Sequence, residues 1–242
     1  MSLTGRRVLI TGAARGLGAT LARHLAEAGA TVILADILQD EGRAVAAELG
    51  ASFAQVDLRD AQSISALADA IGGPLHGLVN NGAIATGIGG IGFEEVEIDT
   101  WNRVMEVNVR GTWLMTRAAA PLLRQAGDAR IVNVASDTAL WGAPNLISYT
   151  ASKGAVISMT RSLARELGPD GIGVTAIAPG ILTTPSTDYV PRARHAHYED
   201  GRAVPGPQPP EDIAGTVAFL LSAAALTLTG QVLPVNRGFV FT

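Results

Sequence analysis

Tyr149 and Lys153 are the two residues whose types and spacing suggest chemistry most directly. They stand four residues apart at the start of a segment with strong helix-forming character, so a helix would place them on one face. A free tyrosine has a pKa near ~10, and a nearby ammonium favours its phenolate. Bringing that pKa to ~7–8 corresponds to roughly 3–4 kcal/mol of differential interaction, and Tyr149 would then act as an acid/base group. The alternative interpretation is an ordinary surface pair.

Lys153 is also the only lysine of the chain. The 242-residue sequence holds 18 lysine and arginine residues, and all of them except Lys153 are arginines. Arginine would supply positive charge but not a compact ammonium on a flexible stem. The use of arginine at every other cationic position therefore indicates that Lys153 is present for a chemical role.

Ser136 and Asn108 could complete an acid/base site. Ser136 follows the apolar run 131–135, which we expect to be a strand, and ligands of open α/β sheets gather at the carboxyl ends of strands. Its hydroxyl could hold a substrate oxygen. Asn108 interrupts an otherwise good helix, and could hold a water that passes protons from Lys153 to solvent. The alternatives are a turn cap for Ser136 and a polar surface position for Asn108.

A glycine-rich turn precedes the first expected helix. Gly12, Gly16 and Gly18 permit a tight turn and a close approach of backbone to phosphate, and the helix start offers free N–H groups to a pyrophosphate. A glycine triplet alone is a weak signal. Asp36, at the end of the next expected strand, lies close to the distance expected for a ribose-binding acid, which favours NAD(H) over NADP(H). Arg15, inside the turn, could pair with a phosphate.

Polar residues also follow the third and fourth expected strands. Asp57 and Leu58 could contact the adenine, although Asp57 could instead cap a helix. The paired amides Asn80 and Asn81 precede Gly82 and would suit the floor of a cofactor cleft; alone they would indicate a turn.

The rest of the sequence predicts an α/β framework that could position these residues. Short apolar runs alternate with longer amphipathic segments, which indicates βαβ units and a parallel sheet covered on both faces. We expect one domain over residues 1–242, with a doubly wound, Rossmann-type sheet of about seven strands. The expected strands are Arg7–Thr11, Thr31–Asp36, Ser52–Asp57, Gly77–Asn80, Arg130–Ala135, Gly173–Ala178 and Val232–Val235. The expected helices are Gly16–Gly29, Asp40–Gly50, Gln62–Ile71, Asp99–Gln125 with a bend near Asn108 or Gly111, Tyr149–Leu167 and Glu211–Ser222.

Composition narrows the class of protein. Hydrophobic residues make up 48% of the chain and charged residues 17%, which argues against disorder. The net charge of −4 offers no basic surface for nucleic acid, and the absence of cysteine excludes disulfides and thiolate metal sites. The early strand leaves no room for a signal peptide, and the apolar stretch 214–228 contains polar residues, so we expect no membrane association and a cytoplasmic location.

Residues 182–210 break the alternation of strands and helices. A loop this long is usually a lid or a disordered stretch, and we expect it to select the substrate with help from Trp141 and Asn145. A polar or acidic substrate group could reach its polar side chains, although a solvated mobile lid is the favoured interpretation. We reject a metal site because the two histidines have no other convergent ligands. The polar side chains are Arg192, Arg194, His195, His197, Tyr198 and Arg202.

Together these motifs resemble the classical short-chain dehydrogenase/reductase family over essentially the whole chain. Residues 11–18 fit its Thr-Gly-x-x-x-Gly-x-Gly turn, and residues 149–153 fit its Tyr-x-x-x-Lys signature. The resemblance implies a catalytic tetrad of Asn108, Ser136, Tyr149 and Lys153. It also implies a cofactor site of Gly12, Arg15, Gly16, Leu17, Gly18, Asp36, Ile37, Asp57, Leu58, Asn81, Tyr149, Lys153, Pro179, Gly180, Leu182 and Thr184.

The resemblance also implies a mechanism. In the oxidation direction the Tyr149 phenolate takes the alcohol proton while a hydride passes to the nicotinamide. Ser136 orients the substrate oxygen, Lys153 lowers the pKa of Tyr149 and binds the nicotinamide ribose, and Asn108 supports a proton relay. Relatives are commonly homo-oligomers, and the apolar tail 239–241 would suit a dimer or tetramer interface or its own domain equally well.

Two departures from the family pattern stand out. The usual Asn-Asn-Ala-Gly is Asn-Asn-Gly-Ala at 80–83, and the usual Asp-Gly-Gly is Asn-Arg-Gly at 236–238. The leading hypothesis is an NAD(H)-dependent alcohol or polyol dehydrogenase that interconverts a secondary alcohol and a ketone. One alternative is a 3-oxoacyl-[acyl-carrier-protein] reductase, which would favour NADPH. An alternative of another class is a nucleotide-sensing protein without turnover.

Overall fold

A single seven-stranded sheet organises the computed structural model, which describes residues 2–242. Its strand order is β3-β2-β1-β4-β5-β6-β7, and every neighbouring pair is parallel. The predicted doubly wound Rossmann-type sheet is therefore confirmed. The strands are β1 (Arg7–Thr11), β2 (Thr31–Asp36), β3 (Ser52–Gln55), β4 (Gly77–Asn80), β5 (Ala129–Val134), β6 (Ile172–Pro179) and β7 (Val232–Val235).

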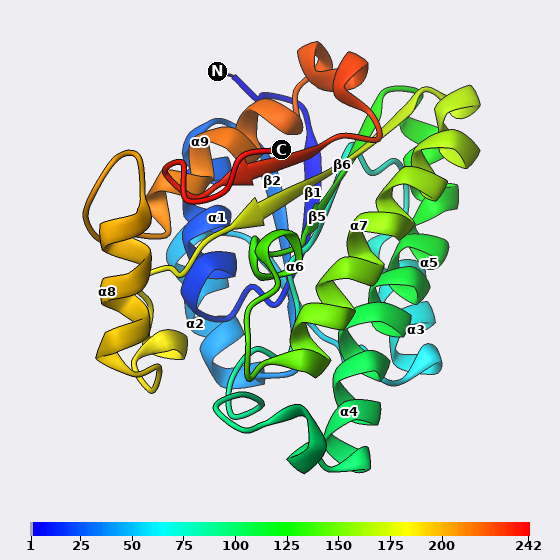
Figure 1. Ribbon diagram of the computed structural model, residues 1–242. Helices are drawn as coiled ribbons and strands as arrows, with labels where there is room; N and C mark the ends of the chain where they lie inside the picture. The colour runs from blue at the N-terminus through cyan, green and yellow to red at the C-terminus, as the bar shows by residue number, and fades with distance from the viewer. Residues whose placement is uncertain (1) are drawn as a thin grey trace.

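Helices cover the sheet on both faces (Figure 1). One layer holds α1, α2 and α9, and the opposite layer holds α3, α4, α5 and α7. The helices are α1 (Gly16–Glu27), α2 (Gln39–Leu49), α3 (Ala61–Ile71), α4 (Ile98–Met105), α5 (Thr112–Ala126), α6 (Thr138–Trp141), α7 (Ile147–Leu167), α8 (Arg192–Gly201) and α9 (Glu211–Leu220). Short helical turns are η1 (Phe93–Glu95), the π-helical η2 (Glu106–Gly111), η3 (Gly168–Asp170), η4 (Pro185–Thr187) and η5 (Ala223–Leu228).

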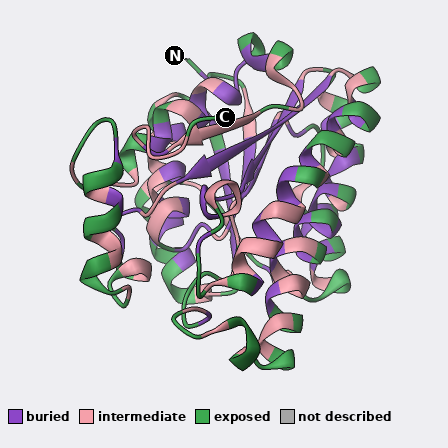
Figure 2. Ribbon diagram, viewed as in Figure 1, coloured by how far each residue is buried: buried purple, intermediate pink, exposed green. Residues whose placement is uncertain are grey.

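The hydrophobic core lies between the sheet and its two helical layers. Apolar side chains of α1 and α9 pack on one face, and those of α3, α5 and α7 pack on the other. Figure 2 shows the central strands and the inner helix faces as mostly buried, the edge strand β7 as intermediate and the outer helix faces as largely exposed. No helix within residues 2–242 is both long and apolar enough to span a membrane.

The strand order reverses between β1 and β4. From β1 the chain continues to β2 on one side, and from β4 it continues to β5 on the other side. The carboxyl ends of β1 and β4 therefore border a crevice. Thr11 ends β1 and Asn80 ends β4. Any ligand of this sheet is therefore expected beside the turns that follow these two residues.

Two predicted segments differ from the structure in an informative way. The segment predicted as one helix over 99–125 is divided by the π-helical turn η2, at the place where a bend was expected. Residues 182–210 are not one loop, because they contain η4 and α8. Helix α8 could not be recognised from an apolar stripe, because its residues are mostly polar.

Candidate active site

The turn between β1 and α1 has the backbone geometry of a phosphate cradle. Gly12 and Gly16 adopt positive φ angles of 65° and 53°, which side chains disfavour. Helix α1 begins at Gly16 with no side-chain cap, so its first N–H groups are available to a ligand. A Cβ at Gly16 would have no neighbour closer than 4.0 Å. This open backbone fits the pyrophosphate of a dinucleotide.

Gly18 and Asn81 hold the turn in shape. A Cβ at Gly18 would lie 2.0 Å from the Gly12 carbonyl oxygen, so no other residue fits there. The Asn81 side chain donates hydrogen bonds to the carbonyl oxygens of Thr11 and Gly12, each at 3.0 Å. Asn81 therefore supports the turn from β4, whereas Asn80 points inward and donates to Asn133.

Asp36 ends β2 beside the glycine turn. One carboxylate oxygen accepts a hydrogen bond from the Ala14 N–H at 2.9 Å, and the other accepts from the Leu38 N–H at 3.0 Å. These two bonds fix the carboxylate at the edge of the turn, where the resemblance predicts the ribose-binding acid. Ile37 follows it and is half exposed.

Asp57 and Leu58 border the same crevice from the next strand. Asp57 forms an ion pair with Arg59 at 2.7 Å, and this hydrogen-bonded partner lowers the pKa of the Asp57 carboxyl. Leu58 lies so close to Gly82 and Gly111 that a Cβ at Gly82 would meet its side chain at 2.8 Å and one at Gly111 would meet its carbonyl oxygen at 2.8 Å. The two glycines thus let Leu58 enter the crevice.

Tyr149 and Lys153 lie on the first two turns of α7. The Lys153 ammonium nitrogen lies 5.5 Å from the Tyr149 ring centroid and donates a hydrogen bond to the Val134 carbonyl oxygen at 2.7 Å. Only 4% of Lys153 is exposed, so the lone lysine is buried at the carboxyl end of β5 rather than paired on the surface. The structure brings the two residues together as predicted.

Burial sets the proton affinities of this pair. It raises the pKa of Tyr149 to about 12, although hydrogen bonding with Ser136 opposes the rise. It lowers the pKa of Lys153 to about 8. The sequence predicts that the ammonium lowers the pKa of Tyr149, but in the structure this pKa is raised, because desolvation outweighs the other influences on the phenol.

Ser136 follows β5 directly and faces Tyr149. Its hydroxyl oxygen accepts hydrogen bonds from the Thr138 hydroxyl at 3.0 Å and the Thr138 N–H at 3.3 Å. Because Ser136 accepts both of these bonds, its own hydroxyl hydrogen can be donated to the Tyr149 phenol or to a substrate oxygen. Ser136 thus has the position predicted for a residue that orients a substrate oxygen.

Asn108 lies in the π-helical turn η2 and is 1% exposed. Its side-chain oxygen accepts from the Ile84 N–H at 2.8 Å, and its amide nitrogen donates to the Ile84 carbonyl oxygen at 3.0 Å and the Ser152 hydroxyl at 3.1 Å. The amide thereby connects η2 to α7 and to the loop after β4. A π-helical insertion is often found at functional sites, and here it turns the amide inward. A role in a proton relay stays a prediction.

The segment after β6 covers the crevice. The Tyr189 hydroxyl donates to the Ala85 carbonyl oxygen at 2.8 Å, and the Thr86 hydroxyl donates to the Ser186 carbonyl oxygen at 3.4 Å. Pro179 ends β6 and Gly180 follows it, and Leu182 and Thr184 come next in the covering segment, where both are buried. Leu17 lies on the first turn of α1, and Arg15 immediately precedes α1 with an exposed side chain that forms no cap hydrogen bond.

Comparison with known proteins agrees with this arrangement. A family model described as enoyl-(acyl carrier protein) reductase matches residues 12–240. A 3-alpha-(or 20-beta)-hydroxysteroid dehydrogenase of Mycobacterium bovis is 38% identical over 250 residues, covering 98% of this chain and 90% of the relative. The chain belongs to the classical short-chain dehydrogenase/reductase family.

Two solved structures of similar proteins cover almost all of this short-chain dehydrogenase/reductase. A 3-ketoacyl-(acyl-carrier-protein) reductase from Brucella melitensis, complexed with NADH, has a TM-score of 0.92 and 34% identity, covering 99% of this chain and 100% of its own. A candidate NAD(P)-dependent gluconate 5-dehydrogenase from Beutenbergia cavernae, with NADP bound at low occupancy, has a TM-score of 0.90 and 35% identity, covering 98% of each chain.

Four of the six polar residues predicted to meet an acidic substrate group pack around Trp141 in this short-chain dehydrogenase/reductase. They are Arg194, His197, Tyr198 and Arg202, the last of which lies over the Tyr198 ring. Arg202 is buried and donates to the Ile181 carbonyl oxygen at 2.8 Å. His195 bonds the Thr187 carbonyl oxygen, and Tyr198 is buried. The Arg194 guanidinium lies 5.5 Å from the Trp141 ring centroid, and the His197 ring centroid lies 5.8 Å from it. Several of these side chains bond to the segment's own backbone or to Trp141, and the mobility of the lid stays a prediction.

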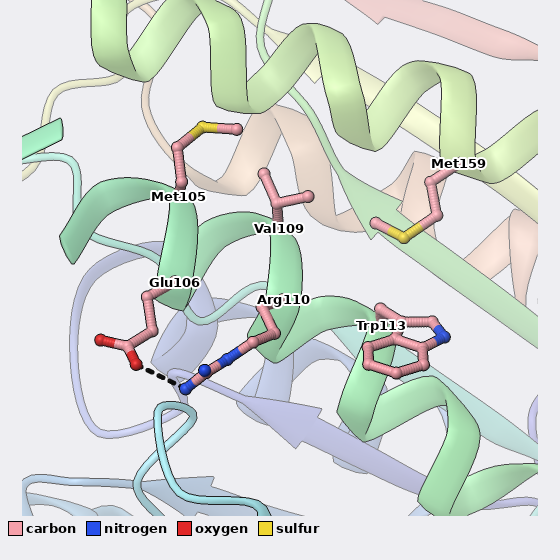
Figure 3. Close-up of a pocket in the computed structure, with 6 residues that line it drawn as sticks. All are labelled: Met105, Glu106, Val109, Arg110, Trp113 and Met159. Carbon is pink, nitrogen blue, oxygen red and sulfur yellow. Dashed lines mark hydrogen bonds and ion pairs between the residues drawn. The ribbon is translucent and has the colours of Figure 1, made fainter. Parts of the chain in front are cut away.

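A separate hollow lies on the outer surface of the enzyme fold (Figure 3). It has a volume of about 490 Å³ and is lined by Met105, Glu106, Val109, Arg110, Trp113 and Met159. The apolar side chains converge on it, and the Glu106–Arg110 ion pair lies at its border (Figure 3). None of the candidate catalytic residues lines it, so it is distinct from the crevice.

Three residues of the crevice escaped sequence reasoning. Thr11 accepts hydrogen bonds from the N–H groups of Asn81 and Gly82, Ser152 links Asn108 to α7, and Tyr189 anchors the covering segment. Thr11 and Ser152 lie inside the two family motifs, so their positions carried a signal. Tyr189 lies in an irregular segment and carried none.

Proposed function

We propose that this protein is an NAD(H)-dependent oxidoreductase that interconverts a secondary alcohol and a ketone. The observation that carries the proposal is the buried lysine beside Tyr149, with Ser136 facing the same phenol at the carboxyl edge of the sheet. The related hydroxysteroid dehydrogenase supports an alcohol substrate. The glycine turn in the adjacent crevice supports a dinucleotide partner.

The chain's own residues account for the proton chemistry. Tyr149 exchanges a proton with the substrate oxygen, which Ser136 holds with its hydroxyl hydrogen. The buried Lys153 ammonium stays next to the phenol because the Val134 carbonyl oxygen fixes it. A bound nicotinamide would accept or supply the hydride. The fold contributes mainly by holding the reacting groups in a fixed orientation, which removes much of the entropic barrier.

Asp36 supports NAD(H) as the cofactor. Its carboxylate is fixed at the edge of the turn by two backbone N–H groups, and a fixed negative charge there repels a 2′-phosphate. Glycines 12, 16 and 18 would hold the pyrophosphate, and Pro179 and Gly180 would border the nicotinamide end. Arg15 is exposed beside the turn and is the feature that would favour NADP(H).

The decisive experiment is a panel of secondary alcohols and ketones, assayed with each of NAD⁺, NADP⁺, NADH and NADPH by nicotinamide absorbance. The proposal expects turnover of alcohols with NAD⁺ at a kcat/KM at least tenfold above that with NADP⁺. Turnover of a 3-oxoacyl thioester with NADPH, and of no simple alcohol, would favour the acyl-carrier-protein reductase alternative. Tight NADH binding without turnover of any substrate would favour a nucleotide-sensing protein.

A further inference from the structure

The carboxylate of Asp137 is fully buried one residue after Ser136. The exposed fraction of Asp137 is 0%, and no role in acid/base chemistry or cofactor binding has been assigned to it above. Its backbone N–H donates to the Pro179 carbonyl oxygen at 3.0 Å, which ties the Ser136 loop to the end of β6. A buried carboxylate is costly unless several donors satisfy it, so its partners indicate what it does.

Helix α8 and the C-terminal segment supply those donors. The Tyr198 hydroxyl, on α8, donates to one carboxylate oxygen of Asp137 at 2.9 Å. The side-chain amide of Asn236, directly after β7, donates to the other oxygen at 3.2 Å. The Trp141 indole N–H donates to the Tyr198 hydroxyl at 3.1 Å, which extends the connection to α6. One carboxylate thus joins three segments that are distant in the sequence.

An aromatic cluster reinforces the same connection. The rings of Tyr198 and Phe239 stack with centroids 4.3 Å apart, and Trp141 meets Phe239 edge to face at 5.7 Å. Figure 1 shows α8 as a separate helix beyond the carboxyl end of β6, away from both layers that cover the sheet. The polar α8 therefore depends on Tyr198 and its partners for attachment.

Gly180 shows how closely the carboxylate fits its surroundings. A Cβ at Gly180 would lie 3.0 Å from a carboxylate oxygen of Asp137 and 3.2 Å from the Asn236 side chain. Gly180 begins the segment that leads to α8, so the position of Asp137 also constrains the start of that segment. The carboxylate is therefore in contact with both ends of the cover over the crevice.

The charged and titratable groups around Asp137 come from each of these elements. Tyr198 on α8 and Asn236 donate to it, Arg202 after α8 attracts it, and Tyr149 on α7 is close enough for the ionised carboxylate to raise the pKa of its phenol. Burial raises the pKa of Asp137 itself to about 6. The carboxylate is thus ionised above that pH and acts electrostatically on the proposed acid/base residue.

We propose that Asp137 is a positioning residue of the active site, whose buried carboxylate fixes helix α8 and the substrate-facing segment before it against the loop that carries Ser136. The proposal deepens the function proposed above and rests on it for its kinetic readouts. It separates the role of Asp137 from that of Tyr149, because Asp137 acts through α8 and through the phenol rather than on the substrate.

Hydrogen exchange of α8 tests the attachment without any substrate. Asp137→Asn places an amide N–H₂ where two donors meet, so Tyr198 or Asn236 loses its acceptor, and Tyr198→Phe removes one donor from the other side. Both variants are expected to exchange the backbone N–H groups of residues 192–201 at least fivefold faster than the parent protein. Asp188→Asn is the matched control, since Asp188 is an exposed aspartate on the segment before α8.

Kinetics test the consequence for the site. Asp137→Asn and Tyr198→Phe should each raise KM for the alcohol at least fivefold and leave the KM for the dinucleotide within twofold. Asp137→Asn should also move the alkaline rise of kcat/KM for alcohol oxidation to lower pH, because the carboxylate no longer raises the pKa of Tyr149. Tyr198→Phe keeps the Asp137 carboxylate and should not move the alkaline rise to lower pH. If Asp137 has a purely structural role, the two variants should have the same pH profile.

The outcomes separate this proposal from the proposed function. Unchanged exchange of residues 192–201 in both variants would overturn the positioning role, whatever the activity. Faster exchange in a protein that oxidises no alcohol would refute the function and retain the attachment of α8. If Asp137→Asn does not fold, Tyr198→Phe carries the test, because it leaves the carboxylate in place.

Discussion

Lys153 illustrates how one buried side chain can define a site. Its ammonium donates to the Val134 carbonyl oxygen at 2.7 Å, and it is a compact point charge, unlike the wider planar guanidinium of arginine. Burial lowers its pKa to about 8, so the group holds its proton at neutral pH and releases it more readily than a free lysine. The chain's general use of arginine makes this exception informative.

Replacing Lys153 by arginine should keep a positive charge and still reduce kcat/KM by about 100-fold or more, the size typical of losing a positioned proton-transfer group. Steady-state kinetics of alcohol oxidation check this. Arg161→Lys, a swap of the same two residue types at an exposed position of α7, should stay within twofold of the parent protein. Full activity of Lys153→Arg would show that charge alone suffices.

Asp36 governs the choice of dinucleotide in the proposed function. Asp36→Asn keeps an acceptor oxygen for the Ala14 or Leu38 N–H but removes the charge that repels a 2′-phosphate. The ratio of kcat/KM with NAD⁺ to that with NADP⁺ should fall at least tenfold, equal to about 1.4 kcal/mol. Asp40→Asn, an exposed position on α2, is the control. An unchanged ratio would remove Asp36 from cofactor selection.

The pH dependence of turnover follows from Tyr149. Oxidation needs the phenolate and reduction needs the phenol, and burial raises the pKa of this group. The rate of alcohol oxidation should therefore increase with rising pH throughout the range from pH 6 to 10. The rate of ketone reduction should stay nearly constant over that range, because the phenol remains protonated below its raised pKa. Initial rates in both directions from pH 6 to 10 measure this, and profiles of the opposite sense would contradict the assignment.

At the scale of elements, close backbone approaches decide where the site forms. Gly18→Ala would place a Cβ 2.0 Å from the Gly12 carbonyl oxygen, which the turn cannot absorb. We expect a loss of more than about 2 kcal/mol in unfolding free energy, with weaker dinucleotide binding. Gly215→Ala, on α9 where nothing lies within 4 Å of the added carbon, should be neutral or stabilising. Thermal unfolding with and without NADH measures both effects.

The elements most easily predicted were those with a periodic apolar pattern. The strands β1, β2, β4 and β7 have the predicted limits. The glycine turn, Asp36, Tyr149 and Lys153 all lie at the carboxyl edge of the sheet, as the strand order implies. Helix α8 was missed because its polar sequence has no apolar stripe, and its attachment depends on Tyr198 meeting Asp137 across 61 residues of sequence. Local sequence patterns cannot reveal a contact between residues so far apart in the chain. They also cannot reveal that burial raises the pKa of Tyr149 more than neighbouring groups lower it.

At the scale of the whole molecule, exposed apolar side chains lie beside the hollow and at the C-terminus. Trp113 is 43% exposed beside the hollow in Figure 3, and Phe241 at the C-terminus is 81% exposed, whereas Phe239 packs in its own domain. We propose a homo-oligomer, dimer or tetramer, that covers the hollow. Patches of this kind on a lone chain are otherwise an aggregation hazard.

Trp113→Asp should shift the protein to a smaller species, because a charge would be buried against the partner's apolar side chains. Sedimentation velocity at several concentrations measures this, and Trp113→Phe should preserve the assembly. A parent protein that sediments as a monomer at all concentrations would contradict the proposal.

The assignment of Tyr149 as the acid/base residue is tested most directly by Tyr149→Phe, which removes one hydroxyl and leaves the ring. NAD⁺-dependent oxidation of the best alcohol from the panel should fall by about 10²–10⁴-fold, as expected for loss of a general acid/base group. NADH binding by the same variant, measured by fluorescence, should stay within twofold. Oxidation that persists within tenfold of the parent rate, with intact NADH binding, would contradict the role of Tyr149.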